Sequence, residues 1–175
     1  MSAFETPRLV VREPRAEDLD ALLEVYASNP DYLELTEGSG GEPGRYDRDM
    51  LERDVGVAQL TPGRRLAGIF LRDGGDAVGV LDWMEANPTD GIPWVGLLII
   101  RRDRQRHGLA SEAFAGLANE LRARGQNAIR AGVIDRNPEG HALVHRLGFE
   151  PVSRTTMRMT AEEEVTIFEL RLSSP

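Results

Sequence analysis

The sequence predicts one domain of the mixed α/β class. Patterns typical of strands and helices follow one another in the order β-α-α-β-β-β-α-β-α-β-β, as in a sheet covered by helices. The 175 residues suffice for one sizeable core. No internal repeat, linker or low-complexity tract divides the chain, so residues 1–175 are expected to fold together.

The N-terminal part is expected to form a strand and two helices. Residues 8–13 alternate between apolar and polar side chains, which predicts a strand that ends before Pro14. Residues 16–28 carry leucines at helical spacing and acidic residues in the first turn, and they predict a helix. A glycine-rich loop over Glu37–Gly44 precedes a second predicted helix, residues 46–60.

Three strands are expected in the middle of the chain. Residues 64–73 and 76–85 predict two strands joined at Gly74-Gly75, a residue pair typical of a hairpin turn. A turn over Ala86–Pro93 follows. Residues 94–100 (WVGLLII) are apolar throughout, so we expect this strand to be buried on both faces.

The C-terminal part predicts two helices and three strands. An apolar helical stripe runs from Gly108 to Gly125. A later helix is expected to start at the cap Asn137, with Pro138 in its first position, and to end at Gly148. The predicted strands are 127–134, 149–160 and 164–172, with an acidic turn over Ala161–Glu164.

The composition argues against several classes of function. Without cysteine the chain has no disulfide, no thiol nucleophile and no cysteine metal ligand, and its three histidines are scattered, so no metal is expected. The net charge of −8 disfavours nucleic-acid binding and suits cationic partners such as amines, although it can serve solubility alone. No apolar run is long enough to cross a membrane, and no secretory pattern is seen, so a cytoplasmic protein is expected.

The junction between the apolar strand and the next helix is very polar. Residues 99–114 read IIRRDRQRHGLASEAF, with four arginines in six positions and Gly108 directly before the helix. Such a junction presents free N–H groups and the positive end of the helix dipole, which bind anions. The glycine would let the backbone approach a phosphate, and the arginines would add charge. The segment indicates a polyphosphate site, the alternative being a solvated basic loop.

This segment resembles the pyrophosphate-binding loop of the GCN5-related N-acetyltransferase (GNAT) superfamily. Residues 105–110 fit the pattern Gln/Arg-x-x-Gly-x-Gly/Ala. Residues 95–100 are similar to the family's fourth strand, residues 137–152 to its Asn-x-x-Ala…Leu-Gly-Phe segment, and residues 6–25 to its opening strand and helix. The resemblance covers nearly the whole chain in the right order. It implies a mixed, mostly antiparallel sheet flanked by helices and splayed between strands 4 and 5.

The resemblance also implies acetyl-CoA as the co-substrate and direct transfer of its acetyl group to a primary amine. The backbone of three strand residues would pair with the pantetheine arm, and loop amides would bind the pyrophosphate. Asn137 would bond near the pantetheine, unless it only caps its helix. Gly140 would let that helix approach the cofactor, and Arg146 or a loop arginine would meet the ribose phosphate. The implied residues are Leu98, Ile99, Ile100, Gln105, Arg106, His107, Gly108, Leu109, Ala110, Ser111, Asn137, Gly140 and Arg146.

The reaction needs a neutral amine. Deprotonation at pH 7 costs roughly 4.6 kcal/mol for a lysine-like amine but only about 1–1.4 kcal/mol for a peptide α-amine. Glu85 and Asp82 are candidate general bases near the end of a predicted strand. Alternation puts them on opposite faces, so at most one faces the cleft, and either could be an ordinary surface acid. A backbone N–H near Leu98 or Ile99 would hold the thioester oxygen.

The chain departs from the family at the general acid. Many members have a tyrosine in the last helix that protonates the departing thiolate, and the matching residue here is Val144. Valine has no proton to donate, so it cannot fill this role. His141 and His145 flank that position as weak substitutes. Expulsion of a free thiolate, with a pKa around 8.5, costs only about 2 kcal/mol at pH 7.

The acceptor is left open. A small-molecule amine is the leading hypothesis, because the 94–114 block is similar to small-molecule acetyltransferases. The absent tyrosine and the opening segment resemble ribosomal-protein N-terminal acetyltransferases, so a protein N-terminus or lysine is the alternative. A non-catalytic acyl-CoA-binding module is a third hypothesis. Trp83, Trp94 and Tyr32 could line an acceptor pocket or belong to the core. A homodimer is expected from the resemblance alone.

Overall fold

The computed structural model describes residues 2–37, 46–158 and 162–172. The strands are β1 Ser2–Glu5, β2 Leu9–Arg12, β3 Arg64–Leu71, β4 Ala77–Met84, β5 Trp94–Ile100, β6 Ala128–Ile134, β7 Glu150–Arg158 and β8 Glu162–Arg171. The α-helices are α1 Leu19–Ala27, α2 Pro30–Glu37, α3 Arg48–Leu60, α4 Leu109–Ala123 and α5 Pro138–Arg146. Two short 3₁₀ turns, Ala16–Asp18 and Arg102–Arg104, precede α1 and α4.

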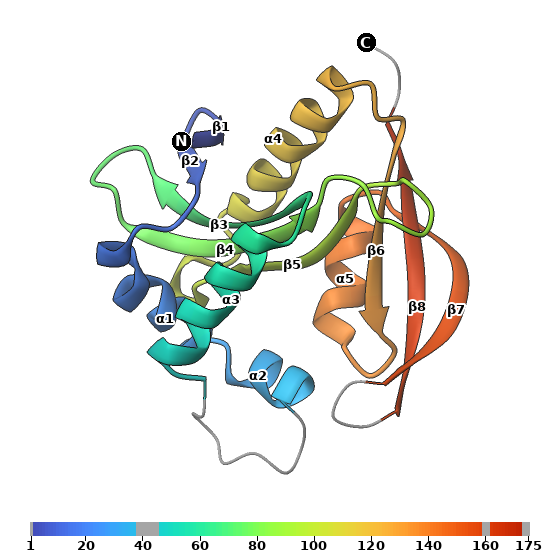
Figure 1. Cartoon of the computed structure of the whole chain (residues 1–175), viewed down its shortest axis with the longest axis horizontal. Coiled ribbons are helices and arrows are strands. Elements are labelled where there is room, and N and C mark those ends of the chain that lie inside the picture. The colour runs from blue at the N-terminus through green and yellow to red at the C-terminus, as the bar shows by residue number, and fades with distance from the viewer. Residues whose placement is uncertain (1, 38–45, 159–161, 173–175) are drawn as a thin grey trace.

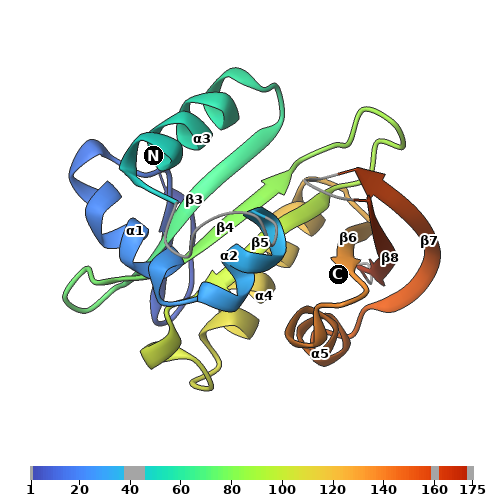
Figure 2. The same cartoon turned by 90° about the horizontal axis from the view of Figure 1, so that it is seen from below.

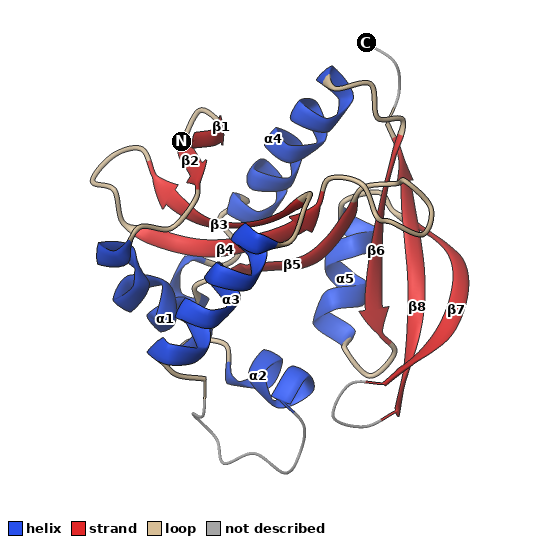
Figure 3. Cartoon of the chain, viewed as in Figure 1, coloured by secondary structure: helices blue, strands red, loops and turns tan. Residues whose placement is uncertain are grey.

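The strands form one sheet in the order β1-β2-β3-β4-β5-β6-β8-β7 (Figure 1). Neighbouring strands are antiparallel, except β5 and β6, which are parallel. Helices flank this sheet, as Figure 3 shows by colour. The predicted mixed, mostly antiparallel sheet flanked by helices is therefore confirmed.

The two faces of the sheet carry separate apolar clusters. α1 and α3 pack on one face, and α4 packs on the other (Figure 2). Along β4, Val80 belongs to the cluster under α1 and α3, whereas Leu81 and Trp83 belong to the α4 cluster. Side chains alternate along a strand, so Asp82 points to the same face as Val80.

The sheet is splayed between β5 and β6. These strands pair only where β5 begins, Trp94 with Arg130 and Val95 with Ala131. The β4–β5 ladder shifts register between Asp82 and Trp83, which leaves Gly96 as a bulge. Beyond the bulge β5 stays paired with β4 alone. Because β1 precedes the strands predicted from the sequence, β5 and β6 are the fourth and fifth predicted strands, and the predicted splay is confirmed.

The splay explains one wrong expectation. β5 is apolar but is not buried on both faces, since only Ile99 and Ile100 are buried. A strand with one open edge keeps part of its surface accessible, whatever its hydrophobicity. The doubly buried strand is instead β4, of which the residues Ala77–Leu81 are all buried.

Other boundaries also differ from the predictions. β1 and α2 were not expected. Glu37 ends α2, and the rest of the predicted loop over Glu37–Gly44 lies outside the described residues. The expected acidic turn is shorter, because Glu162–Glu164 belong to β8 and Ala161 is not described. Within the described ranges, no helix has the length and hydrophobicity needed to span a membrane.

Candidate active site

The backbone between β5 and α4 adopts a conformation that leaves the start of α4 open. Gly108 is the N-cap of α4, in the left-handed region with φ 76°, and among the described residues no side chain caps the helix there. Arg106 has φ 63°, which is uncommon for a residue with a side chain and typical of functional loops. The first hydrogen bond inside α4 runs from the amide of Glu112 to Gly108 O, at 3.0 Å. The amides of Leu109, Ala110 and Ser111 come before it and have no acceptor within the helix.

Gln105 anchors the start of this loop. Its side-chain amide donates to Asn29 Oδ1 at 2.9 Å and to Ile100 O at 3.0 Å. Asn29 is buried and donates to Ile100 O at 3.1 Å. Sequence reasoning missed Asn29, although the dipeptide Asn29-Pro30 is a signal for the helix start that follows it.

A second anchor holds the first turn of α4. Glu112 accepts hydrogen bonds from Thr6 Oγ1 at 2.6 Å and from the Arg8 backbone and side chain at 2.8 and 2.5 Å. Arg8 also donates to His107 O at 3.0 Å. Burial opposes ionisation of Glu112, but the bonds from Thr6 and Arg8 outweigh it and lower the pKa of the carboxyl. Arg8 and Glu112 were not singled out from the sequence, because a partnership across 104 positions leaves no local pattern.

Most of the loop arginines have acidic neighbours. Arg101 pairs with Asp103 at 2.7 Å, Arg102 with Asp31 at 2.8 Å, and Arg104 approaches Asp76 at 3.9 Å. Arg106, like Arg146 on α5, is exposed and has no ion pair among the described residues. The guanidinium groups of Arg106 and Arg146 are therefore open to a phosphate.

Along the open edge of β5, every second residue directs its main-chain N–H and C=O groups away from β4 and into the splay. Arg101, just after β5, donates its N–H to Val78 O of β4 at 2.8 Å, so the main chain of Arg101 faces β4. In an antiparallel ladder every second residue faces the partner strand, so Ile99 also faces β4 while Leu98 and Ile100 face the splay. Ile100 O is already taken by Asn29 and Gln105. The N–H of Leu98, rather than that of Ile99, is therefore directed to the open edge.

The last helix is tightly fitted at its start. Asn137 Oδ1 accepts from Gly140 N at 2.9 Å, which confirms the predicted cap. A Cβ on Gly140 would lie 2.7 Å from Asn137 Nδ2 and 2.9 Å from Val133 Cγ1, so a larger residue would have to displace the side chain that caps the helix. The helix ends at Arg146, and Gly148 follows its cap Leu147 with φ 87°.

The side chains at the position of the family's general acid, and beside it, are apolar or contact an aromatic ring. Val144 is buried in the α4-side cluster. The rings of His141 and His145 each lie edge-on to Phe168, with centroids 5.4 Å apart. His141 Nε2 is buried and has no hydrogen-bond partner in the part of the chain that the structure describes.

A cavity of about 390 Å³ lies on the α1–α3 face, beside the bulge of β5. Aromatic and aliphatic side chains form most of its lining, and three charged side chains enter it. It is lined by Tyr26, Tyr32, Leu33, Tyr46, Asp54, Arg64, Leu66, Asp82, Met84, Trp94, Gly96 and Leu97. We call it the acceptor pocket, after the ligand that we propose for it below. Of the aromatic residues proposed from the sequence, Trp94 and Tyr32 line this pocket, whereas Trp83 is buried in the opposite cluster.

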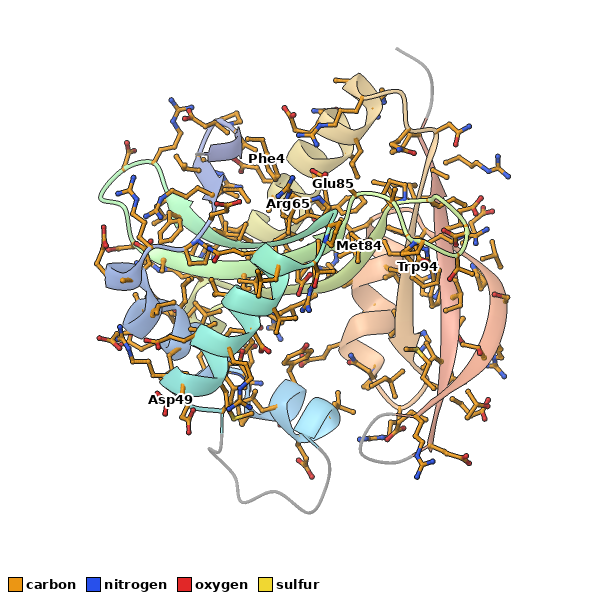
Figure 4. The ribbon with its side chains drawn as sticks, in the orientation of Figure 1. Phe4, Asp49, Arg65, Met84, Glu85 and Trp94 are labelled. Carbon is orange, nitrogen blue, oxygen red and sulfur yellow. The ribbon has the colours of Figure 1, made fainter. Side chains whose placement is uncertain are left out.

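The two candidate bases lie on opposite faces. Asp82 is in the acceptor pocket and accepts from Arg64 Nη2 at 2.6 Å. Glu85 points to the α4 side, where Arg124 Nη1 donates to it at 2.7 Å and Arg65 at 3.2 Å (Figure 4). Burial works against ionisation, but hydrogen bonds from Arg65 and Arg124 lower the pKa of Glu85. A lowered pKa makes a carboxylate a weaker base.

A second carboxylate, Asp54 on α3, enters the acceptor pocket. Tyr46 donates its hydroxyl to Asp54 Oδ2 at 2.5 Å, and its ring lies 4.4 Å from that of Tyr26. Burial is the main cause that raises the pKa of both tyrosines, so both stay protonated at neutral pH. Sequence reasoning missed Tyr46, Asp54 and Arg64. Neither the pocket nor these contacts have a local sequence signal.

Comparison with known proteins decides the family. Residues 8–150 match the sequence profile of the acetyltransferase (GNAT) domain. The chain belongs to the GNAT family of acetyltransferases. Many solved structures share its fold, among them an acetyltransferase from Thermus thermophilus, with a TM-score of 0.77 and 26% identity over 98% of this chain and 100% of that one. A search of curated proteins finds no significant match.

Two GNAT enzymes with the same fold have different acceptors. A Salmonella typhimurium acetyltransferase that modifies the N-terminal serine of a 50S ribosomal subunit protein has a TM-score of 0.79 and 15% identity, over 96% of this chain and 97% of that one. A spermidine N-acetyltransferase from Vibrio cholerae, solved in complex with CoA and spermine, has a TM-score of 0.69 and 16% identity, over 95% and 96%. At such identities the likeness concerns the fold and leaves the acceptor of this GNAT protein open.

Proposed function

We propose that this enzyme transfers the acetyl group of acetyl-CoA directly to a primary amine of a small molecule. The observation that carries the proposal is the acceptor pocket, which reaches β5 at Gly96 and Leu97, next to the open edge at Leu98. A volume of about 390 Å³ suits a small ligand rather than an extended peptide. The alternative acceptor, a protein N-terminus or lysine, would need a more open groove.

The residues present fit acetyl-CoA. The uncapped start of α4 and the left-handed Gly108 offer main-chain N–H groups to a pyrophosphate. The exposed Arg106, or Arg146 on α5, would meet the ribose phosphate. The open edge of β5 would pair with the pantetheine arm, as an added strand does. Acetyl-CoA supplies the activated thioester.

Asp82 is the general base that we propose. It lies in the acceptor pocket, whereas Glu85 lies on the other face with two arginines. Asp82 would accept the proton of the amine directly or through water. Arg64 holds the carboxylate with Nη2 at 2.6 Å and Nε at 3.2 Å, which fixes its direction.

The N–H of Leu98 would donate to the thioester oxygen, because it is directed to the open edge. Such a donor stabilises the negative charge that develops as the amine attacks. Val144 cannot donate a proton, and the two histidines beside it contact Phe168. The thiolate would therefore leave without a protein acid, at a cost of about 2 kcal/mol at pH 7.

The proposal is tested by following CoA thiol release with a panel of small amines and short peptides. Faster turnover of a small amine than of every peptide supports the proposal. Turnover of peptides alone would favour the protein acceptor. Cofactor binding without turnover of any amine would favour the non-catalytic module.

A further inference from the structure

The charges in the acceptor pocket do not cancel. Arg64 is engaged by Asp82 through Nη2 and Nε. Asp54 is half-buried and has no salt bridge within the ranges that the structure describes. Two carboxylates and one guanidinium leave one negative charge inside the pocket. A bound acceptor with a positive charge would compensate it, and one with a carboxylate would be repelled.

Asp54 is held in a fixed direction. The Tyr46 hydroxyl donates to Oδ2, which leaves the second carboxylate oxygen for another donor. The Tyr46 ring lies 4.4 Å from that of Tyr26, a buried residue of α1. The carboxylate is thus oriented before an acceptor binds, which reduces the entropy lost on binding.

The rest of the pocket suits an aliphatic cation. Tyrosine and tryptophan rings attract ammonium groups, and Tyr26, Tyr32 and Trp94 are all in the lining. Leu33, Leu66, Met84 and Leu97 add apolar surface for methylene groups. The pocket therefore combines a hydrophobic wall with a charged group that the proposed transfer reaction does not use.

We propose that Asp54, positioned by Tyr46, selects acceptors that carry a second positive charge, such as unbranched aliphatic diamines. This inference rests on the proposed function. One amine of such an acceptor would react in neutral form near Asp82, beside β5. The other would stay an ammonium ion and bind Asp54. The charge of the second group would also make the reacting amine easier to deprotonate.

The test compares two acceptors of equal length, 1,4-diaminobutane and n-pentylamine, by steady-state CoA thiol release. We expect a kcat/KM about tenfold or more higher for the diamine. Asp54→Asn should remove this preference by raising the KM of the diamine, with kcat within about threefold of the parent. Tyr46→Phe keeps the ring and should reduce the preference in part.

Asp49→Asn is the matched control. It removes the same charge from the same helix, but Asp49 is exposed and lies well away from Met84 and Trp94 (Figure 4). This variant should keep the parent preference. Equal use of both amines by the parent, or an unchanged preference in Asp54→Asn, would overturn the inference while the proposed function stands. No thiol release with any amine, in protein that gains no thermal stability from acetyl-CoA, would overturn both.

Discussion

The side-chain amide of Gln105 lies 2.9 Å from Asn29 Oδ1, across 76 positions of the chain. Both side chains also donate to Ile100 O, at the end of β5. This arrangement ties the loop that carries Gly108 to the α1–α2 junction and to the open strand. A polar network around the buried Asn29 therefore helps to hold the phosphate site that we propose.

Gln105→Leu should weaken both folding and cofactor binding. The substitution leaves the buried Asn29 oxygen without its donor, which costs about 1–3 kcal/mol. Each kcal/mol lowers the Tm of a chain of this size by roughly 2–4 °C. Thermal unfolding with and without acetyl-CoA measures both effects. Gln126→Leu, just after α4, is the control, and a Gln105→Leu variant that matches it in both readouts would contradict the anchoring role.

Asp82→Asn should lower kcat by roughly 10²–10⁴-fold if Asp82 is the base. Glu85→Gln should leave kcat near the parent value, because Glu85 faces α4 and Arg124. Steady-state kinetics at saturating acetyl-CoA compare the two variants, and circular dichroism checks their folding. The opposite ranking would identify Glu85 as the base.

Asn137 caps α5, and we propose that its side-chain N–H groups also bind near the pantetheine arm; substitution can separate the two roles. Asn137→Asp keeps an oxygen for the Gly140 amide but loses the side-chain N–H groups, so it should preserve the Tm and raise the KM for acetyl-CoA. Asn137→Ala loses the cap as well, and should cost about 1 kcal/mol of folding stability. An unchanged KM in a folded Asn137→Asp variant would leave only the capping role.

Acid should selectively weaken the Arg12–Asp18 pair. Hydrogen bonds from Arg12 at 2.6 and 2.8 Å, and one from the Arg15 amide, lower the pKa of Asp18 in the folded state. A lowered folded pKa gives stability that is complete above the unfolded value of about 3.9 and lost as the pH falls through the folded value. Asp18→Asn should therefore destabilise the protein at pH 7 and much less near pH 3.

Urea unfolding at the two pH values measures this effect. Glu17→Gln serves as the control, since it removes an exposed neighbouring carboxylate that lies 3.8 Å from Arg15. An Asp18→Asn deficit that is the same at both pH values would show that the pair does not depend on ionisation of Asp18.

Local patterns were enough to predict much of this fold. The Gly74-Gly75 hairpin, the helix that follows Gly108, and the cap Asn137 with its helix are all set by neighbouring residues. β1 has only four residues and packs on the distant helix α4. So short a segment shows no alternation of apolar and polar residues from which a strand could be predicted. α2 is short and partly acidic, and lacks a clear apolar stripe.

The candidate site could be predicted from the sequence only where a short sequence motif marks it. Residues 105–110 could be proposed from their pattern, but Asn29, Arg8 and Glu112 act through partners 76–104 positions away. Alternation placed Asp82 and Glu85 on opposite faces and could not tell which face holds a pocket. That choice depends on α1 and α3 and on the bulge at Gly96, which are features of the folded chain.

Acetyl-CoA binding at the start of α4 is the central claim, and a thermal-shift titration tests it most directly. The parent should gain about 2.7 kcal/mol at 100 times the Kd, a rise in Tm of roughly 5–10 °C. Gly108→Glu adds a negative side chain at φ 76° and should abolish the rise, whereas Gly75→Glu adds the same group at φ 73° in the β3–β4 turn and should retain it. No rise in the parent at millimolar acetyl-CoA, or an equal rise in Gly108→Glu, would contradict the claim.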